Sequence, residues 1–214
     1  MPNWCNNTLF VEGDLNALSD FKKKVLKVNE HNTINFTMQE LYPTPAELLE
    51  QSAPNMWKGE EDDIDGRMAF EKQLDELKEK YGHTDWYNWR VENWGTKWDV
   101  AESEVDEVDG ESLIVHYNTA WAPNSEFVIF ASEVYPSLKF RLSFEEPGMG
   151  FCGITICEGG ELITQRDGDL EWIDPDTDRL VEWSSDNDRW MYIDTNEIID
   201  DEDFYPQEHN PFII

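Results

Sequence analysis

A tryptophan-rich stretch at residues 86–100, WYNWRVENWGTKWDV, constrains the fold of this chain more than any other feature. Five of the ten tryptophans lie between Trp86 and Trp121, and indole rings stabilise a protein mainly when they are buried with the N–H group paired. Apolar or β-branched side chains occupy every second position from Trp94 to Val100, which is typical of one face of a strand, with Gly95 as a candidate bulge. We therefore predict a strand at the structural centre of the protein. Two runs are expected to pack against it: residues 119–123 (TAWAP) and 145–151 (EEPGMGF).

The chain order of the other elements indicates the fold class. We expect a strand at residues 7–12, a helix at residues 15–28 capped by Asp14, and a second strand at residues 35–41. An amphipathic helix between Ile64 and Tyr81 follows within an irregular segment. The later expectations are a strand at residues 112–118, a helix opening after Pro123 with Asn124 or Ser125 as its cap, and a strand at residues 138–144 that alternates apolar and polar side chains.

This order predicts an α+β protein with a ferredoxin-like antiparallel sheet and helices on one face. The sheet domain is expected to span residues 1–155, with a helical insertion at about residues 43–85. Short strands separated by turns follow. Residues 156–214 are therefore predicted to form an acidic β-meander that packs on the sheet or extends it.

Four segments of this chain resemble one known family. They are residues 1–14 (MPNWCNNTLFVEGD), 86–100, 119–123 and 144–151 (FEEPGMGF), in this order and with unusual tryptophan content. They resemble the phage- and plasmid-encoded YubB-type family, whose members have an N-terminal ferredoxin-like domain. The resemblance covers roughly residues 1–155. It implies a mobile-element origin and a ferredoxin-like fold, and it carries no activity with it.

The charge of the chain limits its partners. The formal net charge is −31, from 47 acidic and 16 basic side chains, and such a surface repels nucleic-acid phosphates and anionic lipids. Residues 158–208 alone hold 18 acidic and 3 basic side chains. We therefore expect no direct nucleic-acid binding and no membrane binding, and a charged partner should be basic.

Cysteine usage and the N-terminal residues indicate the compartment. Three cysteines at positions 5, 152 and 157 form no disulfide framework, so free thiols in a reducing compartment are expected. The first residues show no basic segment followed by an apolar run, and no window approaches a membrane span. We expect the protein in the host cytosol.

Catalytic and metal-binding motifs are not evident. The four histidines are scattered, and no nucleophile elbow, phosphate loop or zinc-hydrolase helix occurs. Asp174, Asp176 and Asp178 have the first spacings of a calcium loop, but Arg179 stands where the loop needs glycine and Ser185 where it needs a bidentate glutamate. We therefore predict a protein that is not an enzyme and has no metal or cofactor.

The favoured hypothesis is an interaction protein of phage or mobile-element origin. It would bind a basic host protein, such as a nucleic-acid-handling or defence protein, because carboxylates on a rigid scaffold imitate the phosphates of a duplex. Solubility alone is the simpler explanation of the charge. The predicted contact residues are Asp167, Asp169, Glu171, Asp174, Asp176, Asp178, Asp186, Asp188, Asp200, Asp201, Glu202 and Asp203.

The alternative hypothesis is a small-ligand-binding or enzymatic domain. Its pocket would lie on the open face of the sheet, near Lys139, Arg141 and the tryptophans. The tryptophans are expected to divide into two groups: Trp89, Trp94, Trp98 and Trp121 in the core, and Trp172, Trp183 and Trp190 partly exposed in the acidic tail.

Overall fold

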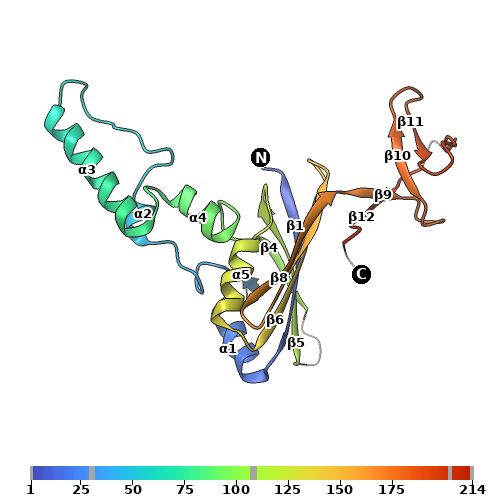
Figure 1. Ribbon diagram of the computed structural model, residues 1–214, viewed down its shortest axis with the longest axis horizontal. Coiled ribbons are helices and arrows are strands. Elements are labelled where there is room, and N and C mark those ends of the chain that lie inside the picture. The colour runs from blue at the N-terminus through green and yellow to red at the C-terminus, as the bar shows by residue number, and fades with distance from the viewer. Residues whose placement is uncertain (1, 29–31, 107–109, 202–203, 213–214) are drawn as a thin grey trace.

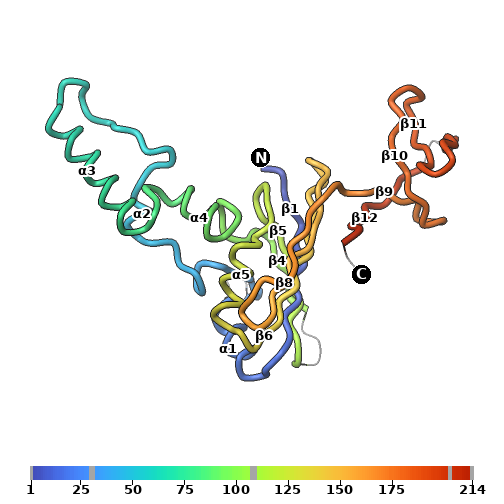
Figure 2. The backbone as a smooth tube through the Cα atoms, in the orientation of Figure 1, coloured from blue at the N-terminus to red at the C-terminus, as the bar shows by residue number. Residues whose placement is uncertain are grey.

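A six-stranded antiparallel sheet forms the body of the protein (Figures 1 and 2). The computed structural model describes residues 2–28, 32–106, 110–201 and 204–212. The strand order is β4-β5-β1-β6-β7-β8, and every pairing is antiparallel. The strands are β1 (Trp4–Gly13), β4 (Ala101–Asp106), β5 (Ser112–Ala120), β6 (Leu138–Glu146), β7 (Phe151–Glu158) and β8 (Glu161–Asp169).

Helices α1 (Leu15–Val25) and α5 (Ser125–Val134) cover one face of this sheet (Figure 1). The chain order β1, α1, β4, β5, α5, β6 combined with the strand order β4-β5-β1-β6 is the ferredoxin-like arrangement. The predicted fold class is therefore confirmed. Helix α1 begins as expected, because the Asp14 carboxylate accepts hydrogen bonds from the backbone N–H groups of Asn16 and Ala17 at 3.1 and 2.9 Å.

The main core lies between these helices and the sheet. Alternate residues of β6 are buried, as the sequence pattern predicts, so its even-numbered side chains from Leu138 face the helices. Phe21 of α1 packs edge-on against Phe140 of β6, with ring centroids 5.3 Å apart. The odd-numbered residues of β6 point to the opposite face, which none of the described helices covers (Figure 1).

An insertion separates α1 from β4. It contains a short hairpin of β2 (Leu26–Val28) and β3 (Ile34–Phe36), then α2 (Ala46–Leu49), α3 (Ile64–Tyr81) and α4 (Trp86–Trp94). Helix α3 matches its predicted span and extends away from the sheet (Figure 2). Two predictions need correction: the first helix ends at Val25 rather than at residue 28, and the strand expected at residues 35–41 is confined to β3.

The strand predicted at residues 86–100 is wrong, because its first nine residues form the helix α4. Both ends carry helix signals. The Asp85 carboxylate accepts a hydrogen bond from the Asn88 N–H at 2.9 Å, and Gly95 ends the helix with φ of 83°. Gly95 is thus a C-terminal cap and not a bulge. The central role of the stretch is nevertheless confirmed, since Trp94 is fully buried and its indole N–H donates to the Tyr42 carbonyl at 2.9 Å.

A second, smaller sheet follows the large one. Strands β7 and β8 complete the large sheet, so residue 155, where the domain boundary was expected, lies inside β7. The small sheet projects from the end of the molecule opposite α3 (Figure 1). Its order is β11-β10-β9-β12, with β9 (Glu171–Ile173), β10 (Leu180–Ser184), β11 (Arg189–Tyr192) and β12 (Gln207–His209). None of the helices in the described residues is long and apolar enough to cross a membrane.

Candidate functional site

The small sheet is attached to the large sheet at both of its ends. On entry, Leu170 is buried, and its N–H donates to the Gly150 carbonyl at 2.7 Å. On return, the buried Asn210 side chain donates to the carbonyls of Phe144 and Gly153 at 3.0 and 3.2 Å. These contacts fix the position at which the small sheet leaves the body.

Three tryptophans form the aromatic centre of the small sheet. Trp190 lies between the other two, with ring centroids 5.8 Å from Trp172 and 5.6 Å from Trp183. Trp183 is 51% exposed, and the other two are half-buried, so the predicted partial exposure is confirmed. A shallow cavity of about 390 Å³ adjoins them. Its lining comprises Trp183, Asn187, Asp188, Arg189, Trp190, Ile199, Asp201 and Phe204.

Asp174 is the structural residue of this sheet. Its carboxylate is buried and accepts hydrogen bonds from the Asp176 N–H at 2.9 Å, from the Thr177 hydroxyl at 2.8 Å and from the Tyr192 hydroxyl. The Tyr192 hydroxyl is the main reason that the pKa of Asp174 lies below its usual value. Asp174 therefore holds the β9–β10 turn together, and its carboxylate, unlike those of the exposed predicted contact residues, is bound within the chain.

Arg179 is also engaged within the small sheet. Its guanidinium lies 3.6 Å from the centre of the Tyr192 ring and 2.6 Å from the Asp194 carboxylate. Arg179, the first basic residue after Asp174, Asp176 and Asp178, is thus already paired within the chain.

The other predicted contact residues are distributed over β8 and the small sheet. Glu171 is half-buried on β9, and Glu202 and Asp203 lie outside the described residues. Four further exposed carboxylates lie from β10 to β12 and were not predicted, because their strand or turn positions alone do not distinguish them: Glu182, Asp194, Glu197 and Glu208. The exposed predicted residues are Asp167 and Asp169 on β8, Asp176 and Asp178 in the β9–β10 turn, Asp186 and Asp188 in the β10–β11 turn, and Asp200 and Asp201 after β11.

A second aromatic surface lies at one end of the large sheet. Trp98 and Trp121 are 39% and 43% exposed, so their predicted burial is wrong, whereas the burial of Trp89 and Trp94 is confirmed. Trp121 is exposed for a local reason: it directly follows the last residue of β5, where the chain turns, and has φ of 72°. The Lys97 ammonium lies 4.1 Å from the Trp98 ring and 5.8 Å from the Trp121 ring.

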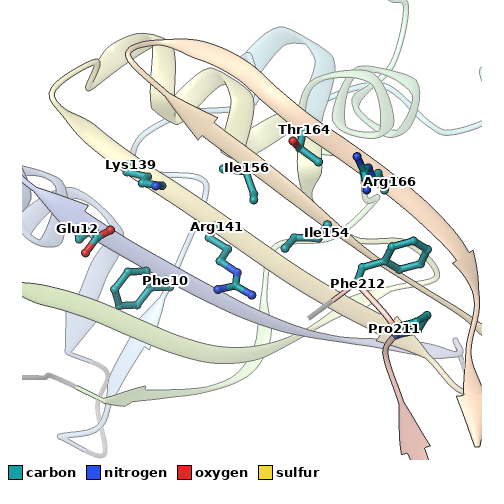
Figure 3. A pocket seen from close by; sticks show the side chains of 10 residues that line it. All are labelled: Phe10, Glu12, Lys139, Arg141, Ile154, Ile156, Thr164, Arg166, Pro211 and Phe212. Carbon is teal, nitrogen blue, oxygen red and sulfur yellow. The ribbon is translucent and has the colours of Figure 1, made fainter. Parts of the chain in front are cut away.

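The open face of the large sheet holds a cavity of about 450 Å³ (Figure 3). Lys139 and Arg141 line it, as the alternative hypothesis expects, but its lining contains no tryptophan. Within the residues that the structure describes, His, Cys, Asp and Glu side chains form no group of three suited to a metal ion.

Comparisons with known proteins identify the family. A family model described as "Ferredoxin-like domain in Api92-like protein" matches residues 93–179, a region that starts later and ends later than the expected resemblance. The uncharacterized protein YubB of Escherichia coli (strain K12) is 32% identical over 99 residues, which cover 45% of this chain and 68% of YubB. The crystal structure of a protein api92 from Yersinia pseudotuberculosis is 12% identical, with a TM-score of 0.47, over 79% of this chain and 98% of that chain. The extent and identity of the match to YubB show that this chain belongs to the YubB family.

Proposed function

We propose that this protein binds a basic protein partner through the small sheet β9–β12. The observation that carries the proposal is an exposed aromatic centre, with Trp183 at its most accessible point, whose cavity is also lined by the carboxylates Asp188 and Asp201. We further propose that the chain is an accessory protein of a phage or plasmid and acts in the host cytosol.

The aromatic centre would supply the affinity of such an interface. Binding energy in protein interfaces concentrates in a few residues, and tryptophan is enriched among them. Trp183 presents half of its surface on a sheet that projects from the body (Figure 1). Carboxylates around such a residue select partners that place Lys or Arg side chains opposite them.

The carboxylates would supply the approach and the selection of the partner. A strongly negative surface accelerates association with a basic protein and loses this effect as salt rises. A host protein with a nucleic-acid channel presents the required basic surface, so a nucleic-acid-handling or defence protein is the partner class that we propose. The protein would then occupy that channel in place of nucleic acid.

The test is affinity capture from host lysate with two variants that change the charge equally. The first variant has Asp176, Asp178, Asp186 and Asp188 replaced by Asn. Asp178 and Asp188 have φ of 56° and 55°, a conformation that asparagine also tolerates. The matched control replaces four exposed carboxylates in and beside α3: Glu61→Gln, Asp62→Asn, Asp75→Asn and Glu79→Gln.

We expect a basic protein to be retained at low salt by the wild type and by the α3 control, but not by the small-sheet variant. A further variant, Trp183→Ser, should weaken the binding free energy of the captured partner by about 2 kcal/mol or more if the aromatic centre is the binding hot spot. Equal retention by both charge variants, or retention that is insensitive to salt, would rule out the proposed interface.

A further inference from the structure

We propose that the open face of the large sheet binds an organic phosphate of mononucleotide size. The site is the cavity of about 450 Å³ formed by side chains of β1, β6, β7 and β8 and by the returning C-terminal segment (Figure 3). This volume lies within the range of small-molecule pockets, roughly 300–1,000 Å³. The proposal is independent of the partner-binding role of the small sheet.

Strand register places the lining residues in rows across the sheet. Phe10 of β1 pairs with Arg141 of β6, Arg141 with Ile156 of β7, and Ile156 with Thr164 of β8. Directly paired residues project on the same face of a sheet, with β-carbons about 5 Å apart. This row therefore forms a continuous floor that joins an aromatic ring, a guanidinium, an aliphatic side chain and a hydroxyl. Arg166 stands in the adjacent row, opposite Ile154.

The cavity concentrates positive charge on a very acidic protein. Three of the 16 basic residues, Lys139, Arg141 and Arg166, line it, and Glu12 is its one acidic lining residue. Lys139 pairs with Glu12 in the register and lies 3.4 Å from the Glu158 carboxylate, so its charge is largely compensated. In the strand register, Arg141 lies opposite Phe10 and Ile156, and Arg166 lies opposite Ile154, so both arginines border the apolar part of the lining.

The positions of the two arginines suit a phosphate. Strands β6 and β8 both flank β7, so their backbones lie about 10 Å apart. Two long arginine side chains can reach a common group above β7 from this separation, and the planar guanidinium binds phosphate oxygens in pairs.

The remaining walls of the cavity are apolar and call for an organic ligand. Phe10 forms one end, and Phe212 lies near the other end, beside Ile154 and Arg166 (Figure 3). Phe212 is held in place because its N–H donates to the Asn210 side chain at 3.0 Å, and Asn210 is itself buried against the sheet. We assign Phe10, on the rigid strand β1, as the surface on which the planar part of the ligand stacks.

The test is titration of the full-length chain with adenosine 5′-monophosphate, followed by calorimetry and by NMR of the backbone amides. We expect the amide shifts to concentrate on β6, β7 and β8. Arg141→Gln and Arg166→Gln should each weaken binding about tenfold or more, because each removes a charged hydrogen-bond partner. Lys24→Gln, an exposed residue on α1, makes the same charge change on the other side of the sheet and should leave binding unchanged.

Two further probes separate the phosphate from the planar group. Phe10→Ala should weaken binding of adenosine 5′-monophosphate and leave binding of ribose 5-phosphate unchanged. The proposal is overturned if the arginine variants bind like Lys24→Gln, if inorganic phosphate binds as tightly as the nucleotide, or if the nucleotide shifts no amide of these strands. Since the Asp variants of the small sheet should bind the nucleotide normally, failure of one proposal is distinguishable from failure of the other.

Discussion

The three cysteine thiols are buried and form no disulfide. Burial is the main cause of their raised pKa values, about 12 for Cys5 and about 11 for Cys152 and Cys157. Only the thiolate reacts rapidly with alkylating agents, and at pH 8 a thiol of pKa about 11 is ionised in about one molecule in a thousand. We predict that iodoacetamide at pH 8 leaves all three unmodified in the native protein and modifies all three in urea, as mass spectrometry would show. Rapid alkylation of a native thiol would contradict this burial.

Asp174 should control the stability of the small sheet. Its carboxylate joins the β9–β10 turn to Tyr192 of β11, and Asp174→Asn replaces one acceptor oxygen by a donor. We expect the small sheet to lose about 1–2 kcal/mol. Because local unfolding exposes peptide bonds, trypsin should cleave the variant faster after Arg179 and Arg189, while cleavage after Arg67 on α3 stays unchanged.

The same carboxylate gives a pH dependence with a defined sign. The folded-state pKa of Asp174 is lowered, chiefly by the Tyr192 hydroxyl. Its contribution to stability is therefore complete above the unfolded-state value of about 4 and is lost as pH falls through the folded-state value. The protection of amides in β9–β11 against exchange, relative to the intrinsic exchange rate at each pH, should decrease below about pH 4 in the wild type. Asp174→Asn should remove this change. An unaltered acid response in the variant would assign it to other carboxylates.

At the scale of elements, sequence periodicity predicted the strands and most helices of the ferredoxin-like body. The alternating pattern of β6 was sufficient to predict a strand, because one face of the strand is buried along its whole length and the other face is not. The alternating pattern from Trp94 to Val100 wrongly predicted a strand. Trp94 ends helix α4 and is buried, whereas Trp98 lies after the helix and is partly exposed. Asp85 and Gly95 were the informative residues there, since they mark the two ends of a helix.

The loop after β3 depends on a residue far away in sequence. Asp99 accepts hydrogen bonds from the Thr37 hydroxyl at 2.6 Å and from the N–H groups of Met38 and Gln39 at 2.8 and 3.3 Å. This explains why Met38 and Gln39 do not continue the predicted strand, because their backbone N–H groups are already bound to Asp99. No local pattern around residues 35–41 contains this information.

We predict that Asp99→Ala destabilises the whole protein, since its carboxylate joins the insertion to the start of β4. Loss of the three hydrogen bonds from residues 37–39, together with that from the Val100 N–H, should lower the free energy of unfolding by about 2–3 kcal/mol. The shift in the midpoint of urea unfolding measures this effect. Asp106→Ala is the matched control: its exposed carboxylate lies 3.8 Å from His116, and its loss should cost less than about 1 kcal/mol. Equal shifts for the two variants would show that Asp99 does not anchor the loop.

At the scale of the whole molecule, the sequence predicted that acidity concentrates toward the C-terminal half, but not how the carboxylates are arranged. The exposure of these carboxylates depends on strand pairings such as Trp183 with Trp190 in the small sheet. It also depends on turns such as that of Asp174, whose third partner, Tyr192, lies 18 residues away. The basic cavity was foreseeable in part, because Lys139 and Arg141 alternate with the apolar residues of β6. Arg166 and Phe212 reach it only through the β7–β8 hairpin and the return of the C-terminus.

The excess of 47 carboxylates over 16 basic side chains should make salt a stabiliser of this protein. Like charges on a folded surface repel one another, and this repulsion reaches about 30 Å at 0.01 M salt but about 3 Å at 1 M. Exposed ion pairs such as Lys80 with Glu47, at 2.7 Å, weaken in salt, but each contributes little to stability because water screens it and both side chains must be ordered. We therefore expect the Tm, followed by circular dichroism, to rise with sodium chloride concentration. A variant that combines the four small-sheet and the four α3 substitutions should start from a higher Tm and respond less to salt. If the Tm of the wild type fell with salt, ion pairs rather than repulsion would dominate its electrostatics, and the carboxylates of the small sheet would be matched within the chain instead of being available to a partner.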